Sequence, residues 1–390
     1  MSGAETDSRR LDDYVAELRQ WVSIETFSRD RDAVERLLRM VAQSCTDAGL
    51  AVEWAGGGDG ACRTLLARGG PATAGPGILV LAHLDTVHPE GTLESALPWR
   101  IESDRLYGPG IYDMKGSALM ALSAWRRLRE TGQSPEVPVT FLFSPDEEIG
   151  SPSSRSVIES EARNALATLV VEPARDGGKI VTARKGVARF VITATGKPAH
   201  SGSNFELGRN AISEIARQIP ALDALTDLDA GITVNVGTIS GGTSPNTIAA
   251  HCLIEVDVRV QRLDHVEPTL AAIRSLRPRD PDVVLSIEGD LNRPPFDASE
   301  GSRALFRHAR NLAAGLGIDL IGISAGGGSD GNFTAAMDVP TLDGLGVDGA
   351  GAHTLDEHII LSSVVPRIDL FAELLRTISA KSISIDEVAS

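Results

Sequence analysis

Hydrophobic side chains recur every three or four residues near the start of the chain. This spacing is typical of amphipathic helices that bury one face. Two helices are predicted from it. The positions that define them are Leu11, Tyr14, Val15, Leu18, Trp21 and Val22 in the first, and Val34, Leu37, Leu38 and Val41 in the second.

Short hydrophobic runs follow, each bounded by residues that interrupt regular structure. Their lengths are typical of buried strands. They cover residues 64–67, 78–82, 139–143 and 166–171, and a helical pattern over 116–129 lies between the second and the third. Strands that alternate with helices predict a largely parallel α/β sheet.

The pattern changes after about Lys185. The order becomes strand, helix, strand, strand, helix, strand, which is the ferredoxin-like α+β arrangement. These six elements are predicted over residues 187–195, 209–219, 233–238, 252–260, 266–276 and 283–287. A return linker over 292–297 and helices over 304–316 and 365–379 follow. We therefore expect a discontinuous α/β domain, residues 1–184 and 297–390, interrupted by an inserted domain, residues 185–296.

Length and composition fit this division. A chain of 390 residues is too long for one ordinary core. Hydrophobic residues make up 42% and charged residues 23%, which is typical of folded globular proteins. The formal net charge of −16 repels phosphate backbones and anionic lipids, so we expect neither a nucleic acid nor a membrane as partner.

Cysteine content and the start of the chain indicate a cytoplasmic location. Three cysteines, Cys45, Cys62 and Cys252, do not suit a disulfide framework or a cysteine-built zinc site. No run reaches the roughly 18 apolar residues of a membrane helix. Arg9-Arg10 is followed by Leu-Asp-Asp rather than by an apolar stretch, so no secretory or twin-arginine signal is expected.

A first group of candidate ligands follows the predicted strand 78–82. His83 and Asp85 are two apart, so on an extended chain they point the same way. His83 is a candidate metal ligand, with Asp85 holding its other ring nitrogen and fixing the tautomer. The alternative is a histidine that simply pairs with a loop carboxylate.

Acidic residues mark two further places. Asp113 lies in a glycine-rich turn before the predicted helix 116–129, where it either bridges two cations or caps the helix. Asp146-Glu147-Glu148 follows a strand, and adjacent carboxylates repel each other unless a cation or proton intervenes. One of them is a candidate ligand and another a candidate general base, and a solvated acidic loop is the alternative.

Glu172 and His353 complete the set. Glu172 ends a buried strand and needs a partner there, and small residues before His353 allow close backbone approach. Each also fits an ordinary loop. Taken together, histidines and carboxylates without cysteine favour a catalytic rather than a structural zinc site. Two metals that share one carboxylate fit metal-assisted hydrolysis.

In this order the motifs resemble those of the M20 metallopeptidases, the family of glutamate carboxypeptidase, acetylornithine deacetylase and succinyl-diaminopimelate desuccinylase. The resemblance spans nearly the whole chain and looks closest to glutamate carboxypeptidase. It rests on His83-Leu84-Asp85, Gly108-Pro-Gly-Ile-Tyr-Asp-Met-Lys-Gly116, Asp146-Glu147-Glu148, Val171-Glu172-Pro173, Gly196-Lys-Pro-Ala-His-Ser-Gly202, Asn246, Asp257-Val258-Arg259, Gly326-Gly-Gly-Ser-Asp330 and His353.

The resemblance implies a zinc-exopeptidase-like catalytic domain that holds two Zn²⁺ ions, for which Co²⁺ or Mn²⁺ could substitute. His83, Asp113 and Glu172 would hold one ion, and Asp113, Glu148 and His353 the other. Asp85 would orient His83, and a cis peptide bond is expected at Asp113–Met114. Glu147 would act as general base towards a water that bridges the two ions.

The inserted domain would act as a lid and as the dimerisation domain of a homodimer. His200 would donate a hydrogen bond to the oxyanion, from within the same chain or from the partner subunit. Arg259 would clamp a substrate carboxylate, and Asn246 would add an amide hydrogen bond. A turn histidine and a surface arginine are the alternatives for His200 and Arg259.

The expected activity is hydrolysis of an amide bond next to a free carboxylate. The substrate would be a small acyl-amino acid or a short peptide, cut by a carboxypeptidase or an N-acyl-amino-acid amidohydrolase. Two alternatives stay open. One is a deacetylase or desuccinylase of an amino-acid precursor, or a hydrolase of an unusual aromatic amine. The other is a binding protein that kept the fold and lost catalysis, which the presence of Glu147 disfavours.

Overall fold

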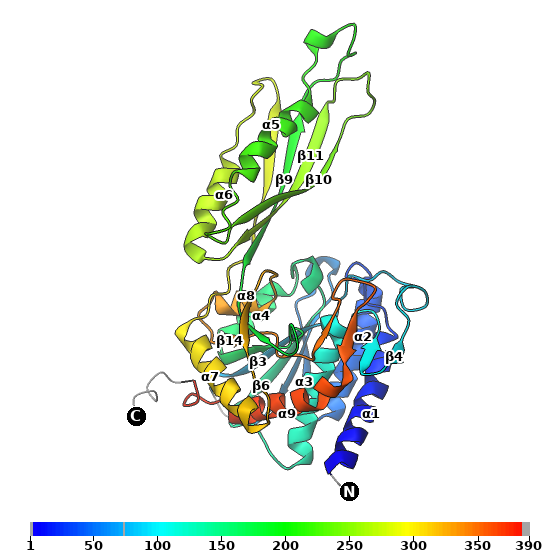
Figure 1. Cartoon of the computed structure of the whole chain (residues 1–390), viewed down its shortest axis with the longest axis vertical. Helices are drawn as coiled ribbons and strands as arrows, with labels where there is room; N and C mark the ends of the chain where they lie inside the picture. Colours follow the sequence, from blue (N-terminus) through cyan, green and yellow to red (C-terminus); the bar gives the residue numbers. More distant parts are fainter. Residues whose placement is uncertain (1–2, 73–74, 384–390) are drawn as a thin grey trace. The chain divides into compact units, whose positions relative to one another are not determined.

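A computed structural model describes residues 3–72 and 75–383 of the chain. Contacts divide the chain into two compact units, shown in Figure 1. Unit 1 comprises Met1–Ala183, Ala298–Ser324 and Ser329–Ser390, and unit 2 comprises Arg184–Asp297 and Ala325–Gly328. Each unit has its own hydrophobic core, so each is described by itself.

Unit 1 is built on a six-stranded sheet in the order β1-β2-β6-β3-β7-β14. Neighbours from β6 to β14 are parallel, while β1–β2 and β2–β6 are antiparallel. The predicted, mostly parallel α/β class is therefore confirmed. The strands are β1 (Ala51–Ala55), β2 (Thr64–Gly69), β3 (Gly77–His83), β6 (Val139–Ser144), β7 (Ala165–Val170) and β14 (Thr341–Leu342).

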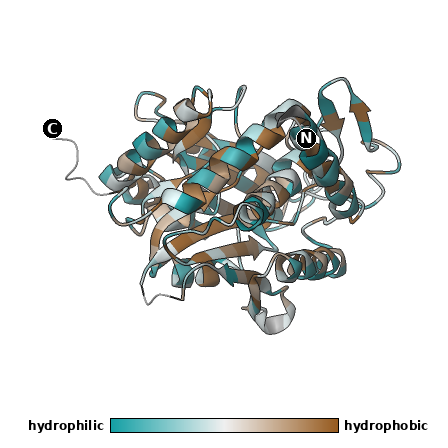
Figure 2. Ribbon diagram, turned by 90° about the horizontal axis from the view of Figure 1, so that it is seen from below, coloured by the Kyte–Doolittle hydropathy of each residue, from teal (hydrophilic) through white to brown (hydrophobic). Residues whose placement is uncertain are grey.

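Helices cover both faces of this sheet because both faces of its central strands are apolar. In β3, Ile78 and Val80 belong to the larger core, while Leu79 and Leu81 belong to a second core on the other face. The larger core includes residues of α1 (Gly3–Val22), α2 (Arg31–Asp47), α3 (Gly116–Glu130), α7 (Glu300–Gly315) and α9 (Leu361–Thr377). The second core includes residues of α4 (Arg155–Ala162) and α8 (Gly331–Ala335). In Figure 2 hydrophobic colouring marks much of the strands, whereas hydrophobic and hydrophilic residues alternate along the helices.

Two smaller sheets accompany the six-stranded sheet. One has the order β15-β16-β5-β4, and the other pairs β8 with β13. Their strands are β4 (Arg100–Glu102), β5 (Arg105–Tyr107), β15 (Gly349–Ala350), β16 (His358–Ile360), β8 (Ile180–Arg184) and β13 (Gly322–Ala325). None of these six strands was predicted from the sequence, nor were β1, β14, α4 and α8, because short or half-exposed segments carry little hydrophobic periodicity.

Unit 2 contains one antiparallel sheet in the order β10-β11-β9-β12. With two helices, its chain order is β-α-β-β-α-β, and this sheet order is that of the ferredoxin-like arrangement. The elements are β9 (Gly186–Thr195), α5 (Ala211–Asp223), β10 (Thr233–Gly241), β11 (His251–Val260), α6 (Val266–Arg274) and β12 (Val284–Arg293). Alternate residues of β9 and β11 pack with α5 and α6 in one core.

Several boundaries differ from the sequence expectation by a few residues, and β12 and α5 are two examples. Strand β12 runs to Arg293, so the first two residues of the expected linker 292–297 belong to a strand. Helix α5 begins at Ala211, after Asn210 accepts a capping hydrogen bond from the Ser213 N–H. Within the described part of the chain, every helix is too short or too polar to traverse a lipid bilayer.

Candidate metal centre

Three parallel strands end at one edge of the unit 1 sheet, and a candidate ligand lies at or shortly after the end of each. His83 is the last residue of β3 and is in register with Ser144, the last residue of β6. Glu148 lies in the 3₁₀ turn η3 (Glu147–Ile149) after β6, and Glu172 comes two residues after β7. Parallel pairing therefore brings the three side chains to the same edge.

Asp113 lies at the centre of the cluster. It sits in the turn η2 (Ile111–Lys115) just before α3, and its peptide bond to Met114 is cis, as predicted. Its Oδ1 lies 3.2 Å from His83 Nε2, and its Oδ2 lies 3.4 Å from His353 Nε2. The two oxygens of one carboxylate thus face two different histidines, which is the arrangement that a bridging ligand requires.

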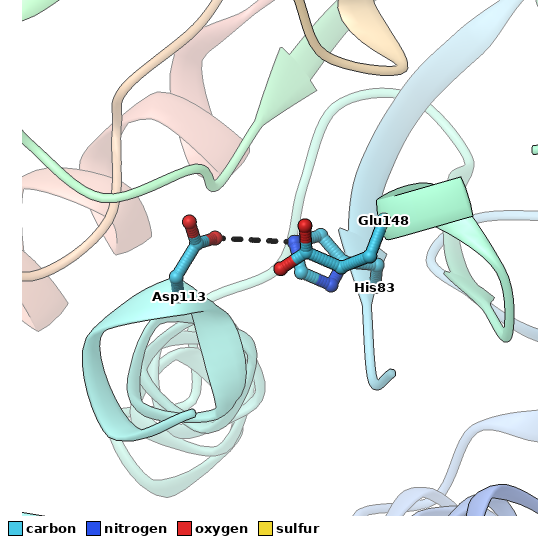
Figure 3. Close-up of side chains that lie close together, drawn as sticks. All are labelled: His83, Asp113 and Glu148. Atoms are coloured by element: carbon cyan, nitrogen blue, oxygen red, sulfur yellow. Dashed lines mark hydrogen bonds and ion pairs between the residues drawn. The ribbon is translucent and has the colours of Figure 1, made fainter. Parts of the chain in front are cut away.

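His353 and the remaining carboxylates close the group. His353 lies between β15 and β16 with φ = 64°, and its Nε2 is 3.2 Å from Glu148 Oε2. On the other side, His83 Nε2 is 3.6 Å from Glu172 Oε1. Figure 3 shows His83, Asp113 and Glu148 converging, with ligand atoms that all lie within 4.8 Å of one another. The structure thus brings together all five residues predicted as ligands.

The surroundings of His83 fix its tautomer. Its Nδ1 lies 2.9 Å from the carbonyl oxygen of Asp85, and a carbonyl only accepts, so Nδ1 carries the proton of the neutral ring. Nε2 then presents a lone pair towards the carboxylates of Asp113 and Glu172. Acceptors that face acceptors repel each other unless a cation or a proton lies between them.

The distances and the unsatisfied atoms fit a metal. Bond lengths of zinc to nitrogen and oxygen imply ligand atoms about 3.3–3.6 Å apart in a tetrahedral site, and the four distances above range from 3.2 to 3.6 Å. The Oε1 atom of Glu148 is buried and has no hydrogen-bond partner. A buried carboxylate oxygen without a donor calls for a cation, so the donor set fits the expected metal.

The carboxylates of the cluster raise the pKa values of both histidines, which shows that the site favours positive charge. Burial opposes a charged His83, yet the hydrogen bond to Asp113 and the charges of Glu172 and Glu147 raise its pKa well above the usual value. Hydrogen bonds to Asp113 and Glu148 raise the pKa of His353 to about 10. The carboxylates therefore attract protons to both imidazoles, as they would attract a metal cation.

Asp85 acts differently from the sequence expectation. Its carbonyl oxygen, not its carboxylate, accepts the hydrogen bond from His83, and the Oδ1 atom lies 3.6 Å from that ring nitrogen. The carboxylate instead accepts hydrogen bonds from the backbone N–H groups of Glu147 and Glu148, at 3.0 and 3.2 Å. Asp85 thus fixes both the imidazole and the acidic turn. Its pKa is raised to about 7, chiefly by burial.

The three adjacent acids of the turn have different surroundings. Asp146 accepts hydrogen bonds from Ser153 and Ser154, so it stabilises the loop before α4. Glu148 faces His353. Glu147 lies between them along the chain, is partly exposed, and has its backbone N–H fixed by Asp85.

His200, the candidate oxyanion donor, belongs to unit 2. Its Nδ1 accepts hydrogen bonds from the N–H groups of Gly202 and Ser203, at 3.1 and 3.2 Å. The proton of the neutral ring therefore resides on Nε2. Because His200 is exposed, this Nε2–H group is available as a donor.

The two candidate substrate-binding residues of unit 2 already have partners. The side-chain Oδ1 of Asn246 accepts a hydrogen bond from the Ser244 hydroxyl, and its backbone carbonyl accepts from the Ser201 N–H, which ties its loop to the neighbour of His200. Arg259 lies on β11, and its guanidinium pairs with both carboxylate oxygens of Asp257, at 2.7 and 2.9 Å. A substrate carboxylate would have to share or displace Asp257.

Two residues near the cluster escape prediction from the sequence. Glu357 is 1% exposed and accepts hydrogen bonds from backbone N–H groups that precede and include that of Asp113. His88 also contacts this carboxylate, at 2.7 Å. The sequence offers one clue to Glu357, its position four residues after His353. In a loop, that spacing does not predict that two side chains lie close together.

Similarity to known proteins extends over most of the chain. The sequence matches Peptidase family M20/M25/M40 over residues 79–377, a range that includes all five residues of the candidate centre. Carboxypeptidase G2 of Pseudomonas sp. strain RS-16 is 31% identical over 314 residues, which cover 78% of this chain and 75% of that protein.

Solved structures support the fold. Aminopeptidase PepT from Bacillus cereus ATCC 10987 superposes with a TM-score of 0.73 at 21% identity, covering 94% of this chain and 98% of that one. The M20 family metallo-carboxypeptidase Sso-CP2 from Sulfolobus solfataricus gives a TM-score of 0.73 at 18% identity, covering 93% and 98%. At these identities the likeness bears on the fold, and the predicted fold class agrees with it.

Proposed function

Because the chain belongs to Peptidase family M20/M25/M40 and is thus a hydrolase of peptide or amide bonds, we propose that it cleaves an amide bond next to a free carboxylate with two bound metal ions. The observation that carries this proposal is Asp113, whose two oxygens face His83 and His353. The products would be a free amino acid, such as glutamate, and either a shortened peptide or a carboxylic acid.

The donor set divides into two groups that share Asp113. His83 and Glu172 would complete one site, and Glu148 and His353 the other. The ions, zinc or else cobalt or manganese, would supply Lewis acidity and lower the pKa of water towards neutrality. The side chain of His353 is 53% exposed, against 2% for His83, so the cluster is open to substrate on the His353 side.

Glu147 is the proposed general base. Its carboxylate would take a proton from the attacking water and deliver it to the nitrogen of the leaving amine. Asp85 supports this role, because its hydrogen bond to the Glu147 N–H fixes the backbone from which the side chain extends. The hydrogen bond to the Glu148 N–H holds the neighbouring ligand in the same turn.

Residues of unit 2 would act on the substrate. The Nε2–H of His200 would donate to the developing oxyanion, since Nδ1 is already an acceptor. Arg259 would bind the substrate carboxylate in exchange for Asp257, and Asn246 would donate an amide hydrogen bond.

A homodimer formed through unit 2 and a cytoplasmic location remain predictions. Exposed apolar residues on unit 2 support the first: Phe205 is 67% exposed, Ile239 56% and Leu207 53%. Such side chains in one unit favour a protein–protein contact. Sedimentation of the purified chain over a range of concentrations would measure its oligomeric state.

The activity test uses metal-depleted protein reloaded with zinc, cobalt or manganese. The panel contains N-acyl amino acids, α- and γ-glutamyl conjugates, dipeptides, and acetylated and succinylated amines. We expect hydrolysis of substrates with a free carboxylate next to the amide bond. Glu147→Gln should lower kcat by about 10²–10⁴-fold and retain metal, while Glu130→Gln, at the exposed end of α3, serves as control. A loaded wild-type protein that cleaves nothing in the panel would refute the proposal.

A further inference from the structure

The carboxylate of Glu357 lies among hydrogen-bond donors from the segment that carries Asp113. Oε1 accepts from the N–H groups of Tyr112 and Asp113, and Oε2 accepts from the N–H of Gly110, each at 2.9 Å. Oε2 also lies 2.7 Å from His88 Nε2. We propose that Glu357, fixed by His88, is a positioning residue that holds Asp113 with its two oxygens facing His83 and His353. This inference rests on the proposed role of Asp113 as a shared metal ligand.

Because Glu357 is buried, loss of the hydrogen bonds to its carboxylate would destabilise the protein locally. Glu357 is 1% exposed, and a buried carboxylate is stable only when hydrogen bonds replace its hydration. Its donors are three backbone N–H groups of one turn and an imidazole, so the negative charge attracts the whole turn. Hydrogen bonds to a charged acceptor are stronger than neutral ones. Glu357 therefore fixes the backbone from which the Asp113 side chain extends.

Strand pairing explains how Glu357 reaches this turn. β16 begins at His358, which is in register with Tyr107, the last residue of β5. The chain leaves β5 directly into the segment that carries Asp113. The residue before β16 is Glu357, so antiparallel pairing places it beside the residues that follow β5.

The same contacts link three segments that carry candidate ligands. Glu357 and His353 share the loop between β15 and β16. Its N–H donors lie in the segment of Asp113, and His88 lies in the loop that leaves β3 after His83. One carboxylate thus couples the positions of His83, Asp113 and His353. A displacement of any one segment would strain these hydrogen bonds.

Gly110 allows the close approach. Its φ is 68°, and a Cβ at this position would collide with the side chain of Thr86. A residue without a side chain is needed for its N–H to reach Oε2 of Glu357. The turn, the carboxylate and the imidazole therefore form one arrangement.

The test compares Glu357→Gln with Glu214→Gln in the full-length chain. Glu214 is a matched control in unit 2, because it is fully buried and accepts hydrogen bonds from the N–H groups of Arg279 and Asp280. Zinc affinity is measured by competition with a chromophoric chelator. We expect Glu357→Gln to weaken zinc binding by about 10- to 100-fold, as for residues that support metal ligands, and Glu214→Gln to leave it unchanged.

A second readout does not depend on metal. Amide hydrogen exchange is followed by mass spectrometry in metal-free protein, on a peptide covering residues 105–118. Loss of the carboxylate should accelerate exchange there roughly tenfold, the equivalent of one hydrogen bond, whereas Glu214→Gln should accelerate exchange only in unit 2. Unchanged exchange in residues 105–118, or zinc affinity equal to that of the control, overturns the inference.

His88→Phe keeps the inference testable if Glu357→Gln fails to fold. Phenylalanine removes the donor to Oε2 and leaves the three backbone donors, so both effects should be present but smaller than with Glu357→Gln. A His88→Phe protein with wild-type exchange and wild-type zinc affinity excludes any role of His88. Wild-type protein that binds no zinc would refute the metal centre, and the exchange measurement would still decide whether Glu357 orders the turn.

Discussion

The two units bury ionisable groups in different ways. In unit 1 His83, Asp85, Asp113, Glu172 and Glu357 are each less than a tenth exposed, and four of them lie at the carboxyl edge of the sheet or in the turn beside it. In unit 2 Glu214 is fully buried, but it accepts three hydrogen bonds from an amide side chain and two backbone N–H groups. One carboxylate with enough donors is a structural element, whereas several acceptors that face one another require a cation.

This difference distinguishes buried carboxylates that stabilise the fold from buried carboxylates that are candidate metal ligands. The carboxylates of Glu357 and Glu214 are satisfied within the chain, and each stabilises the backbone around it. Asp113 and Glu148 face histidine nitrogens, and Oε1 of Glu148 has no partner. The number of donors around a buried carboxylate therefore distinguishes a supporting residue from a candidate ligand.

The distribution of aromatic residues allows the unfolding of the two units to be followed separately. All four tryptophans, Trp21, Trp54, Trp99 and Trp125, lie in unit 1, and no tyrosine lies in unit 2. Tryptophan fluorescence therefore reports unfolding of unit 1 alone. Far-ultraviolet circular dichroism reports both units, so a transition seen only by dichroism belongs to unit 2.

The largest effect is expected at Asp113. Asp113→Asn keeps the shape of the side chain and removes the charge that both histidines face. Activity should fall by more than about 10³-fold, beyond the loss of a single oxyanion donor, and zinc affinity should fall with it. The measurements are kcat/KM and chelator competition, with Asp229→Asn on the surface of unit 2 as control. Retained zinc stoichiometry and affinity would contradict the shared-ligand role.

His200 should affect catalysis without affecting metal. His200→Ala removes the Nε2–H donor and is expected to lower kcat by about 10²–10³-fold. Zinc affinity should remain that of the wild type, because His200 belongs to unit 2 and the five candidate ligands to unit 1. Steady-state kinetics and metal titration separate the two effects. If zinc affinity also falls, the assignment of metal binding to unit 1 alone is wrong.

Glu214 should make the stability of unit 2 depend on pH. Burial opposes its charge, but hydrogen bonds from Arg279, Gln218 and Asp280 lower its pKa below the usual value. A lowered pKa contributes stability above the ordinary glutamate pKa, and that stability is lost as pH falls through the folded value. Glu214→Gln should cost about 1–3 kcal/mol at neutral pH.

Urea unfolding at several pH values, followed by dichroism and fluorescence, checks this prediction. The dichroism transition of wild-type protein should weaken in acid more than that of Glu214→Gln, and the fluorescence transition should not respond to the substitution. Equal acid sensitivity in both proteins would show that Glu214 is not the group responsible.

A smaller loss is expected from the core of unit 2. Ile254 on β11 is fully buried among α5, α6 and β9, so Ile254→Val should cost about 0.5–1.5 kcal/mol. The dichroism transition should shift, while fluorescence and zinc affinity stay constant. A parallel shift in fluorescence would show that the two units unfold together.

The smallest effect is expected from an exposed ion pair. Arg262 and Asp264 pair at 2.8 Å with about 60% of each side chain exposed, a setting in which water and salt screen the attraction. Arg262→Ala should leave both transitions unchanged within error. A measurable loss that disappears in 1 M salt would show that the pair matters.

Sequence by itself determined four of the six strands of the central sheet and the candidate ligands. Apolar runs over 64–67, 78–82, 139–143 and 166–171 correspond to β2, β3, β6 and β7 because strands buried on both faces are hydrophobic throughout. Ligands that follow parallel strands meet at one edge, so the strand pattern alone is enough to group His83, the acidic triplet 146–148 and Glu172. Glycine-rich or small-residue turns added Asp113 and His353 to the set, and the choice of Glu148 as ligand and Glu147 as base came from the resemblance.

Tertiary structure alone decided which atoms support the ligands. Glu357 and Tyr112 are 245 residues apart, and their hydrogen bond depends on the pairing of two three-residue strands that leave no periodic signal. The same holds for the Asp85 carboxylate, which accepts a hydrogen bond from the Glu147 N–H, 62 residues away. Periodicity records whether a residue is buried, whereas the partner of a buried polar atom depends on long-range pairing that a local pattern does not contain.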